Sequence, residues 1–162
     1  MKVIPVCDFN ITALESIFNG EKLKTDVISS PGYEEDAYIT VFYPDGREVT
    51  FWIVPKGRMG KAFTGRALRI RAILMRGDEL DNWMRKEKVT SHDLNEKMAH
   101  SNQNAAQLGA LNVNTLGLCI DYCHFYKTGI LDETVLLLGE IIAVNARLLM
   151  EGQFRSKVRR SQ

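Results

Sequence analysis

The sequence has few of the residues on which disulfide scaffolds, metal centres and nucleophilic active sites depend. Only three of its 162 residues are cysteines, and a small, odd number of cysteines provides no disulfide framework. No serine–histidine–aspartate or cysteine–histidine signature motif is present, and no pair of carboxylates stands out in an apolar stretch. We therefore predict no catalytic residue, no metal ligand and no cofactor, and expect a binding protein rather than an enzyme.

Secretion signals and membrane-spanning runs are also missing. The first ten residues, MKVIPVCDFN, contain no apolar core of signal-peptide length. The most apolar segment, 134–150, is interrupted by Glu140, Asn145 and Arg147, which indicates a buried helix rather than a membrane span. We expect a cytoplasmic protein with no membrane partner. The length and the hydrophobic fraction of 45% predict a single α+β domain over residues 1–154, followed by a basic flexible tail over 155–162.

The apolar pattern divides the chain into a strand-like first third and a helical remainder. Residues 37–54 show period-2 alternation on both sides of a Pro-Asp-Gly turn, which predicts a β-hairpin. Both faces of this hairpin are largely apolar, so we expect helices or another subunit to cover each face. The predicted fold is α+β, with a small antiparallel sheet around the hairpin 37–54 followed by a bundle of about five helices. A further strand is predicted at 24–29, and helices at about 12–19, 64–76, 78–88, 91–110, 114–127 and 132–152.

Residues 56–76 contain seven basic residues and no acidic one, whereas residues 1–55 and 77–154 each carry a net charge of −5. Read as a helix, this segment places Arg66, Arg69 and Arg76 within roughly 80° of one another, with Arg71 pointing elsewhere. Glycines at 57, 60 and 65 would let backbone N–H groups approach a phosphate, although the segment lacks the spacing of a Walker loop. The predicted ligand-binding residues are Arg58, Lys61, Arg66, Arg69, Arg76 and Trp52.

This segment leads to the functional hypothesis of a small non-enzymatic regulatory protein that captures a phosphate-bearing ligand. A nucleotide is favoured over a nucleic-acid backbone, because the flanking acidic segments would repel a long polyanion. Aromatic residues of the hairpin (Tyr38, Phe42 and Trp52) would stack on a base. The competing interpretation is a solvated basic face that pairs with the acidic residues at 34–36 and 78–81.

The alternative function is a protein–protein interaction module, an inhibitor or adaptor, that assembles through apolar helices. Residues 131–149 are apolar nearly all round if helical, and so are residues 114–127. Two such helices need more apolar cover than a chain of this size readily supplies. The sequence therefore predicts a homo-oligomer.

Four further polar features have both a functional and a structural interpretation. Cys119 and Cys123 could bind a metal, but their apolar neighbours favour buried thiols. A carboxylate at Asp121, amid aromatic residues, could have a raised pKa, but a solvent-facing or arginine-paired carboxylate is the better interpretation. The uncharged run at 101–107 is suited either to close packing or to reading the edge of a base. The row His92, Glu96 and His100 has a spacing that could hold a divalent metal, but a solvated helix face is favoured.

Overall fold

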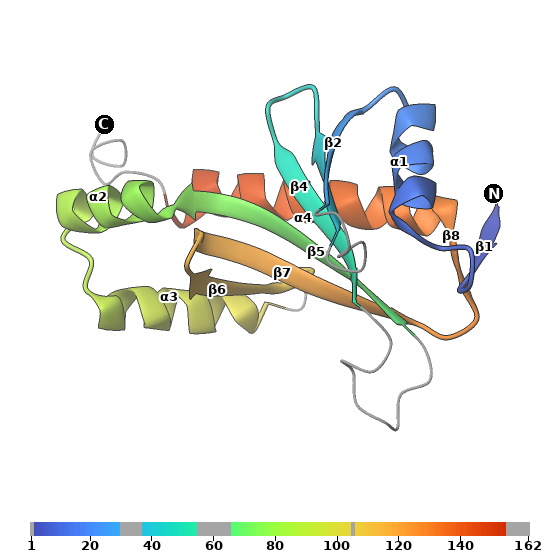
Figure 1. Ribbon diagram of the computed structural model, residues 1–162. Coiled ribbons are helices and arrows are strands. Elements are labelled where there is room, and N and C mark those ends of the chain that lie inside the picture. Colours follow the sequence, from blue (N-terminus) through green and yellow to red (C-terminus); the bar gives the residue numbers. More distant parts are fainter. Residues whose placement is uncertain (1, 30–36, 55–65, 105, 155–162) are drawn as a thin grey trace.

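The computed structural model describes residues 2–29, 37–54, 66–104 and 106–154, which form four helices and eight strands. Six strands make one antiparallel sheet in the order β2-β3-β4-β5-β7-β6, and β1 pairs with β8 in a separate two-stranded sheet (Figure 1). The strands are β1 Val3–Pro5, β2 Lys24–Ile28, β3 Tyr38–Phe42, β4 Glu48–Val54, β5 Arg66–Arg76, β6 Ala110–Asn114, β7 Gly117–Tyr126 and β8 Gly129–Leu131. The helices are α1 Ile11–Gly20, α2 Gly77–Glu87, α3 Ser91–Asn102 and α4 Asp132–Gly152.

The predicted hairpin forms and lies inside the large sheet. Strands β3 and β4 are antiparallel, and Ile39 faces Phe51 across the pair. In the connecting turn, the N–H of Gly46 donates to the carbonyl of Tyr43 at 3.0 Å, and Gly46 has a φ of 88° that a side chain would disfavour. The strand predicted at 24–29 is also confirmed, as β2.

The predicted bundle of about five helices is wrong, because two of its members are strands. Residues 66–76 form β5, which pairs with β4 on one side and with β7 on the other. Most of the segment 114–127 forms β7, which pairs with β5 and β6. The helix expected over 91–110 ends at Asn102, and Ala110 already belongs to β6. The remaining predicted helices are present as α1, α2 and α4.

Helices α1 and α4 cover one face of the large sheet, and α4 runs along β5 (Figure 1). Phe51 of β4 is the centre of this layer, since its ring lies 4.8 Å from that of Phe18 in α1. A Cβ built on Gly139 of α4 would lie only 2.6 Å from Cζ of Phe51, so the helix and the sheet touch closely here. None of the described helices is long and apolar enough to cross a membrane.

The start of α4 is held by the N-terminal strand. The side chain of Asp132 accepts a hydrogen bond from the N–H of Lys2 at 3.0 Å, and its own N–H donates to the carbonyl of Lys2 at the same distance. The bond from the Lys2 N–H lowers the pKa of the Asp132 carboxyl below its usual value. Asp132 is the first residue of the helix and, in the described structure, it joins β1 to α4.

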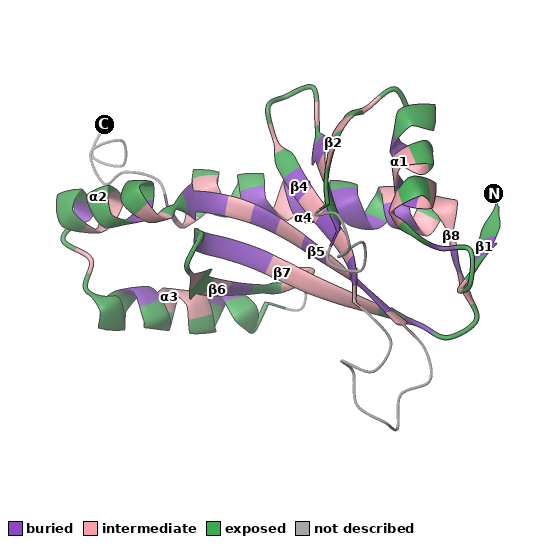
Figure 2. Cartoon of the chain, viewed as in Figure 1, coloured by how far each residue is buried: buried purple, intermediate pink, exposed green. Residues whose placement is uncertain are grey.

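The opposite face of the large sheet, called here the open face, is only partly buried. Along β5, buried Leu68 and Ile70 alternate with half-buried Arg69 and Arg71, and Figure 2 shows buried and intermediate colours alternating along this strand. In β3, Tyr38 on the open face is 37% exposed. Within the described part of the chain, helices therefore cover only one face of the hairpin, because α1 and α4 lie on the other face. Cover of the open face by another subunit stays a prediction.

A β-bulge near the end of β5 changes which side chains reach the open face. Ile73 pairs with Cys119 and Met75 with Leu118, so Leu74 is the extra residue. Leu74 and Met75 are both buried, which breaks the alternation of the strand. As a result, Arg76 lies on the same face as Arg69 and Arg71.

The uncharged run at 101–107 binds the backbone of its own chain. Asn102 closes the outer edge of β6, where its Oδ1 accepts the N–H of Leu111 at 2.7 Å and its Nδ2 donates to the Leu111 carbonyl at 3.1 Å. Gln107 donates to Asn102 at 3.0 Å and to the Gly109 carbonyl at 3.1 Å. The hydroxyl of buried Ser101 donates to Gln107 at 2.7 Å. These amides replace the strand that would otherwise pair with β6.

Replacing Asn102 by alanine is expected to lower the free energy of unfolding by about 1–2 kcal/mol. The substitution removes both bonds to Leu111 and leaves part-buried backbone groups without a partner. Urea denaturation followed by circular dichroism measures the change. Asn95, exposed on the same helix, is the matched control, and its change to alanine should cost nothing because alanine favours helix. Equal costs at the two positions would contradict the role of Asn102.

Candidate functional site

Two arginines of β5 gather around one tryptophan of β4 on the open face. Register places Trp52 opposite Arg69 and Thr50 opposite Arg71. The Cζ atoms of Arg69 and Arg71 lie 5.0 and 5.1 Å from the centroid of the Trp52 ring, within the range of a cation–π contact. We call Trp52, Arg69 and Arg71 the arginine–tryptophan patch.

Asp121 of β7 balances part of the charge of this patch. Its Oδ1 lies 2.8 Å from Nε of Arg71 and 3.9 Å from Nε of Arg69. Its Oδ2 accepts a hydrogen bond from Nδ2 of Asn112 at 2.6 Å, and Asn112 in turn accepts one from Asn114 at 2.9 Å. The interpretation of Asp121 as an arginine-paired carboxylate is confirmed. Because both oxygens are engaged, the geometry gives no support to Asp121 as a general acid or base.

The two arginines differ in how accessible they are. The side chain of Arg69 is 43% exposed, whereas that of Arg71 is 17% exposed and holds the short contact with Asp121. One carboxylate between two guanidinium groups leaves a net positive charge on the patch. Arg69 is therefore the group that an anion in solution can reach, and Arg71 is the group that Asp121 holds in place.

Aromatic side chains extend the patch across the sheet. Tyr38 lies directly opposite Trp52 on the neighbouring strand, so Tyr38, Trp52 and Arg69 form one row over three strands. Strands are spaced about 4.8 Å apart, which puts Tyr38 roughly 10 Å from Arg69. Phe42 is 37% exposed, like Tyr38, and lies on the same face. The open face thus combines a cationic end with an aromatic end.

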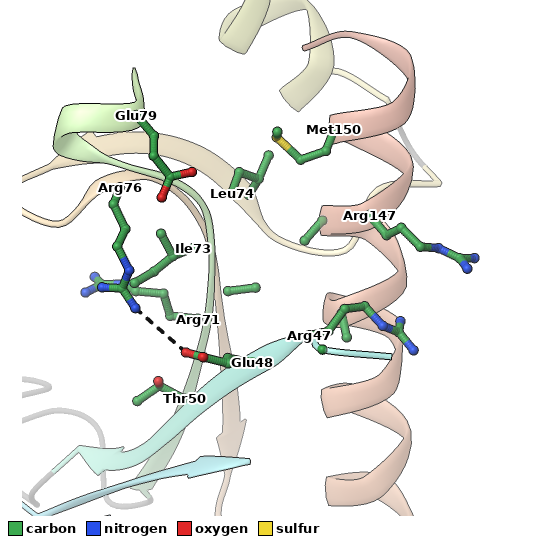
Figure 3. Close-up of a pocket in the computed structure, with 14 residues that line it drawn as sticks. Arg47, Glu48, Thr50, Arg71, Ile73, Leu74, Arg76, Glu79, Arg147 and Met150 are labelled. Atoms are coloured by element: carbon green, nitrogen blue, oxygen red, sulfur yellow. Dashed lines mark ion pairs between the residues drawn. The ribbon is translucent and has the colours of Figure 1, made fainter. Parts of the chain in front are cut away.

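A cavity of about 330 Å³ lies where β5 extends beyond its pairing with β4. Figure 3 shows it between β4, β5 and α4, with Glu79 of α2 directed toward it and Arg147 of α4 directed away from it. Arg76 lies 3.8 Å from Glu48 in its wall, so the charge of Arg76 is partly balanced. Its lining residues are Gly46, Arg47, Glu48, Thr50, Arg71, Ala72, Ile73, Leu74, Arg76, Glu79, Ala143, Ala146, Arg147 and Met150.

The structure separates the residues that the helical interpretation had brought together. Since 66–76 is a strand, the helix edge formed by Arg66, Arg69 and Arg76 does not exist. Arg66 pairs with Tyr126 and is three positions from Arg69 along β5. An odd separation puts the two side chains on opposite faces of the strand, so Arg66 lies toward the helix-covered face. Arg76 is seven residues from Arg69, roughly 20 Å along a strand. Trp52 and Arg69 are adjacent, as a shared site requires, whereas Arg58 and Lys61 lie outside the described residues.

Arg71, Asp121 and Asn112 were missed as members of this surface. The signal that could have found Arg71 is its i, i+2 spacing from Arg69, which puts both on one face of a strand. Asp121 comes from β7, which pairs with β5 only through long-range contacts, and Asn112 comes from β6, which pairs with β7. No local pattern of the sequence specifies that register.

The remaining polar candidates lie apart from the patch or have low chemical reactivity. Cys119 is fully buried and Cys123 partly buried, and burial raises the pKa of both thiols, so they stay protonated at neutral pH. His92 lies 3.2 Å from Glu96 on an exposed helix face, which confirms the solvated interpretation. Within the residues that the structure describes, no three side chains of metal-ligating type come together.

Compared with protein-family models and with curated proteins, the chain matches none.

Proposed function

We propose that the protein is a small non-enzymatic binding protein that captures a phosphate-bearing ligand on the open face of its sheet. The observation that carries the proposal is the accessible guanidinium of Arg69 beside an aromatic row, over a sheet whose other face is buried. An arginine presents a planar fork of donors that matches the oxygens of a phosphate. Asp121 leaves the patch cationic, and it holds Arg71 in position.

A nucleotide fits this surface better than an isolated phosphate. Trp52 already contacts two guanidinium groups, so it orients the arginines, and a base would have to compete with them for its ring. Tyr38 and Phe42 are exposed rings on this face, and stacking on such a ring stabilises any base. With its base on Tyr38 and its phosphate at Arg69, a nucleotide would span the row. A single-stranded nucleic acid is the related ligand that uses the same groups.

Replacing Arg69 by alanine is expected to weaken nucleotide binding by roughly 10- to 100-fold, the effect of losing a charged hydrogen bond. Isothermal titration calorimetry with nucleoside mono-, di- and triphosphates measures the change. Arg85→Ala on α2 is the matched control, because Arg85 bonds only to Asn82 among the described residues. Arg76→Ala tests the cavity as the binding place. If no nucleotide binds the wild type, or if Arg69→Ala leaves binding unchanged, a nucleotide site on the patch is ruled out.

A protein–protein interaction module is the second candidate. It is favoured by apolar side chains on the same open face, since Ile28 is 44% and Phe125 54% exposed. Under this alternative, Arg69 would meet an acidic residue of the partner. A thermal-shift panel separates the two candidates, because only a small-molecule site raises the melting temperature with nucleotide.

A further inference from the structure

Helix α4 carries an apolar stripe that faces away from the sheet. Its members are Leu137, Ile141, Val144 and Leu148, which recur at intervals of four, three and four residues. This is the heptad spacing with which one helix packs along another. Leu137 is 56% and Leu148 54% exposed, while Ile141 and Val144 are half-buried. We call these four residues the outer stripe.

The opposite side of the same helix already serves the core. Its sheet-facing residues are buried, and Val135 and Ile142 are completely inaccessible to solvent. At 100° per residue, the outer stripe is centred roughly opposite these buried residues. The outer stripe is therefore an apolar surface beyond what this sheet requires.

Two charged residues flank the outer stripe on one side. Glu140 precedes Ile141 by one residue, and Arg147 precedes Leu148 by one residue, so the two charges occupy equivalent heptad positions. Both are exposed, and no ion pair joins either of them to another described residue. Glu140 lies close enough to Tyr43 to add to the effect of burial, which raises the pKa of that phenol to about 12. Figure 3 shows Arg147 directed away from the cavity, toward the outside of α4.

We propose that a second copy of this chain docks on the outer stripe, with the two α4 helices antiparallel about a two-fold axis between Ile141 and Val144. In this arrangement Leu137 of each copy meets Leu148 of the other, and Ile141 meets Val144. Glu140 of each copy then lies beside Arg147 of the other, which makes two symmetric ion pairs. A two-fold interface has to be self-complementary in this way.

The charge pattern selects the antiparallel direction. Glu140 and Arg147 lie on one side of the outer stripe, and Asn145 and Gly152 lie on the other side. When two such helices pack in parallel, residues on the first side of one helix face residues on the second side of its partner. Glu140 would then lie near Asn145, and Arg147 near Gly152, with no compensating charge. In an antiparallel pair, equivalent flanks meet, and one flank of this helix carries one acidic and one basic residue. The charges on α4 are therefore complementary only when the two helices are antiparallel.

The size of the outer stripe sets the expected affinity of the dimer. Its ends, Leu137 and Leu148, are eleven positions apart along the helix, which is about 16 Å. A contact of this length falls at the low end of protein interfaces, below about 1,200 Å² in total. We expect a reversible dimer in the micromolar range. The wider oligomer expectation had also relied on a helix at 114–127, which is a strand, so only α4 supports it.

The test is sedimentation equilibrium of the full chain at concentrations from about 5 to 500 µM, which bracket a micromolar dissociation constant. The wild type should shift from monomer to dimer across this range. Glu140→Arg alone and Arg147→Glu alone should each weaken the dimer tenfold or more, because each sets like charges opposite one another twice. An equimolar mixture of the two variants should form a heterodimer, and the double variant Glu140→Arg/Arg147→Glu should recover the wild-type affinity.

Matched controls make the same charge changes on α2, at exposed Asp81 (Asp81→Arg) and Lys86 (Lys86→Glu), and should leave association unchanged. Circular dichroism of every variant verifies folding, which surface substitutions should preserve. A wild type that stays monomeric throughout overturns the proposal. So does a dimer that the single charge reversals leave intact, or one that the double variant and the mixture fail to restore. Association of the outer stripe with some other protein, without self-association, also overturns it.

Discussion

Replacing Gly117 with alanine is expected to lower the free energy of unfolding by at least about 4 kcal/mol, beyond the usual range for a single substitution. Gly117 begins β7 opposite Arg76, at the end of β5. A Cβ at this position would overlap the carbonyl oxygen of Met75 and would lie 2.7 Å from the carbonyl carbon of Arg76. Both atoms belong to the backbone, so neither can rotate away.

The backbone conformation of Gly117 adds to this cost. Its φ of 126° lies in a region that side chains strongly disfavour. Alanine would have to change φ and also separate β7 from β5 at the position where Arg76 reaches the open face. Strain and steric overlap therefore act in the same direction.

Guanidinium chloride denaturation measures the effect, with Gly20→Ala as the matched control. Gly20 ends α1, and a Cβ there would meet no atom within 4 Å. Alanine at Gly20 should stabilise the protein slightly or leave it unchanged, because alanine has fewer unfolded conformations to lose. Similar unfolding midpoints for the two variants would contradict the close approach of β7 to β5 at Gly117.

Replacing Gly139 with alanine is expected to destabilise the protein by about 3 kcal/mol, although alanine normally favours a helix interior over glycine. The new Cβ would lie 2.6 Å from Cζ of Phe51 and 2.7 Å from the hydroxyl of Tyr43. Phe51 is fully buried and packs against Phe18, so its ring has little room to move. Overpacking of the core opposes the gain in helix propensity and exceeds it.

A double-mutant cycle tests the cause of this loss. Phe51→Leu removes the end of the ring that a methyl group on Gly139 would meet, and alone it should cost about 1–2 kcal/mol. Together with Gly139→Ala it should cost clearly less than the sum of the two single changes, because the residues share one space. Urea denaturation of all four proteins gives the coupling energy. Strict additivity would show that α4 and β4 do not meet at Gly139.

The consequence for function lies in the position of the open face. Gly139 lets α4 approach β4 from one side, and Trp52 and Arg69 project from β4 and β5 on the other. Gly117 sets the end of β7, the strand from which Asp121 reaches Arg71. A change at either glycine should therefore also disturb the arginine–tryptophan patch, although neither residue contacts it.

The local sequence pattern was sufficient to predict an element wherever its hydrogen-bonding partners are close in the sequence. The hairpin 37–54 alternates strictly around a turn sequence, so its pairing is specified within 18 residues. Thr90 begins α3 with a capping box in which its hydroxyl accepts the N–H of Asp93 at 3.1 Å. The limits of α4 follow from a long apolar segment with acidic residues in its first turn. For the hairpin, the start of α3 and the limits of α4, the sequence and the tertiary structure agree.

Local pattern failed in β5 and β7, where the partners are distant. Segment 66–76 is rich in arginine, alanine, leucine and methionine, which favour helices, and its apolar residues fit a helical period. The same residues also alternate, with Leu68 and Ile70 on one face and Arg69 and Arg71 on the other. Pairing with β4 on one side and β7 on the other selects the strand over the helix, because a central strand forms hydrogen bonds through all its backbone groups.

The sequence by itself determined the segregation of charge, the hairpin, the long last helix and the concentration of arginine between residues 56 and 76. Tertiary structure alone decided that this segment enters a sheet, and therefore which arginines share a surface. A helix would have grouped Arg66, Arg69 and Arg76, whereas the strand groups Arg69 with Arg71 and sets both beside Trp52 and Asp121. The physical reason is that side-chain direction follows the backbone period, and here long-range strand pairing chose that period.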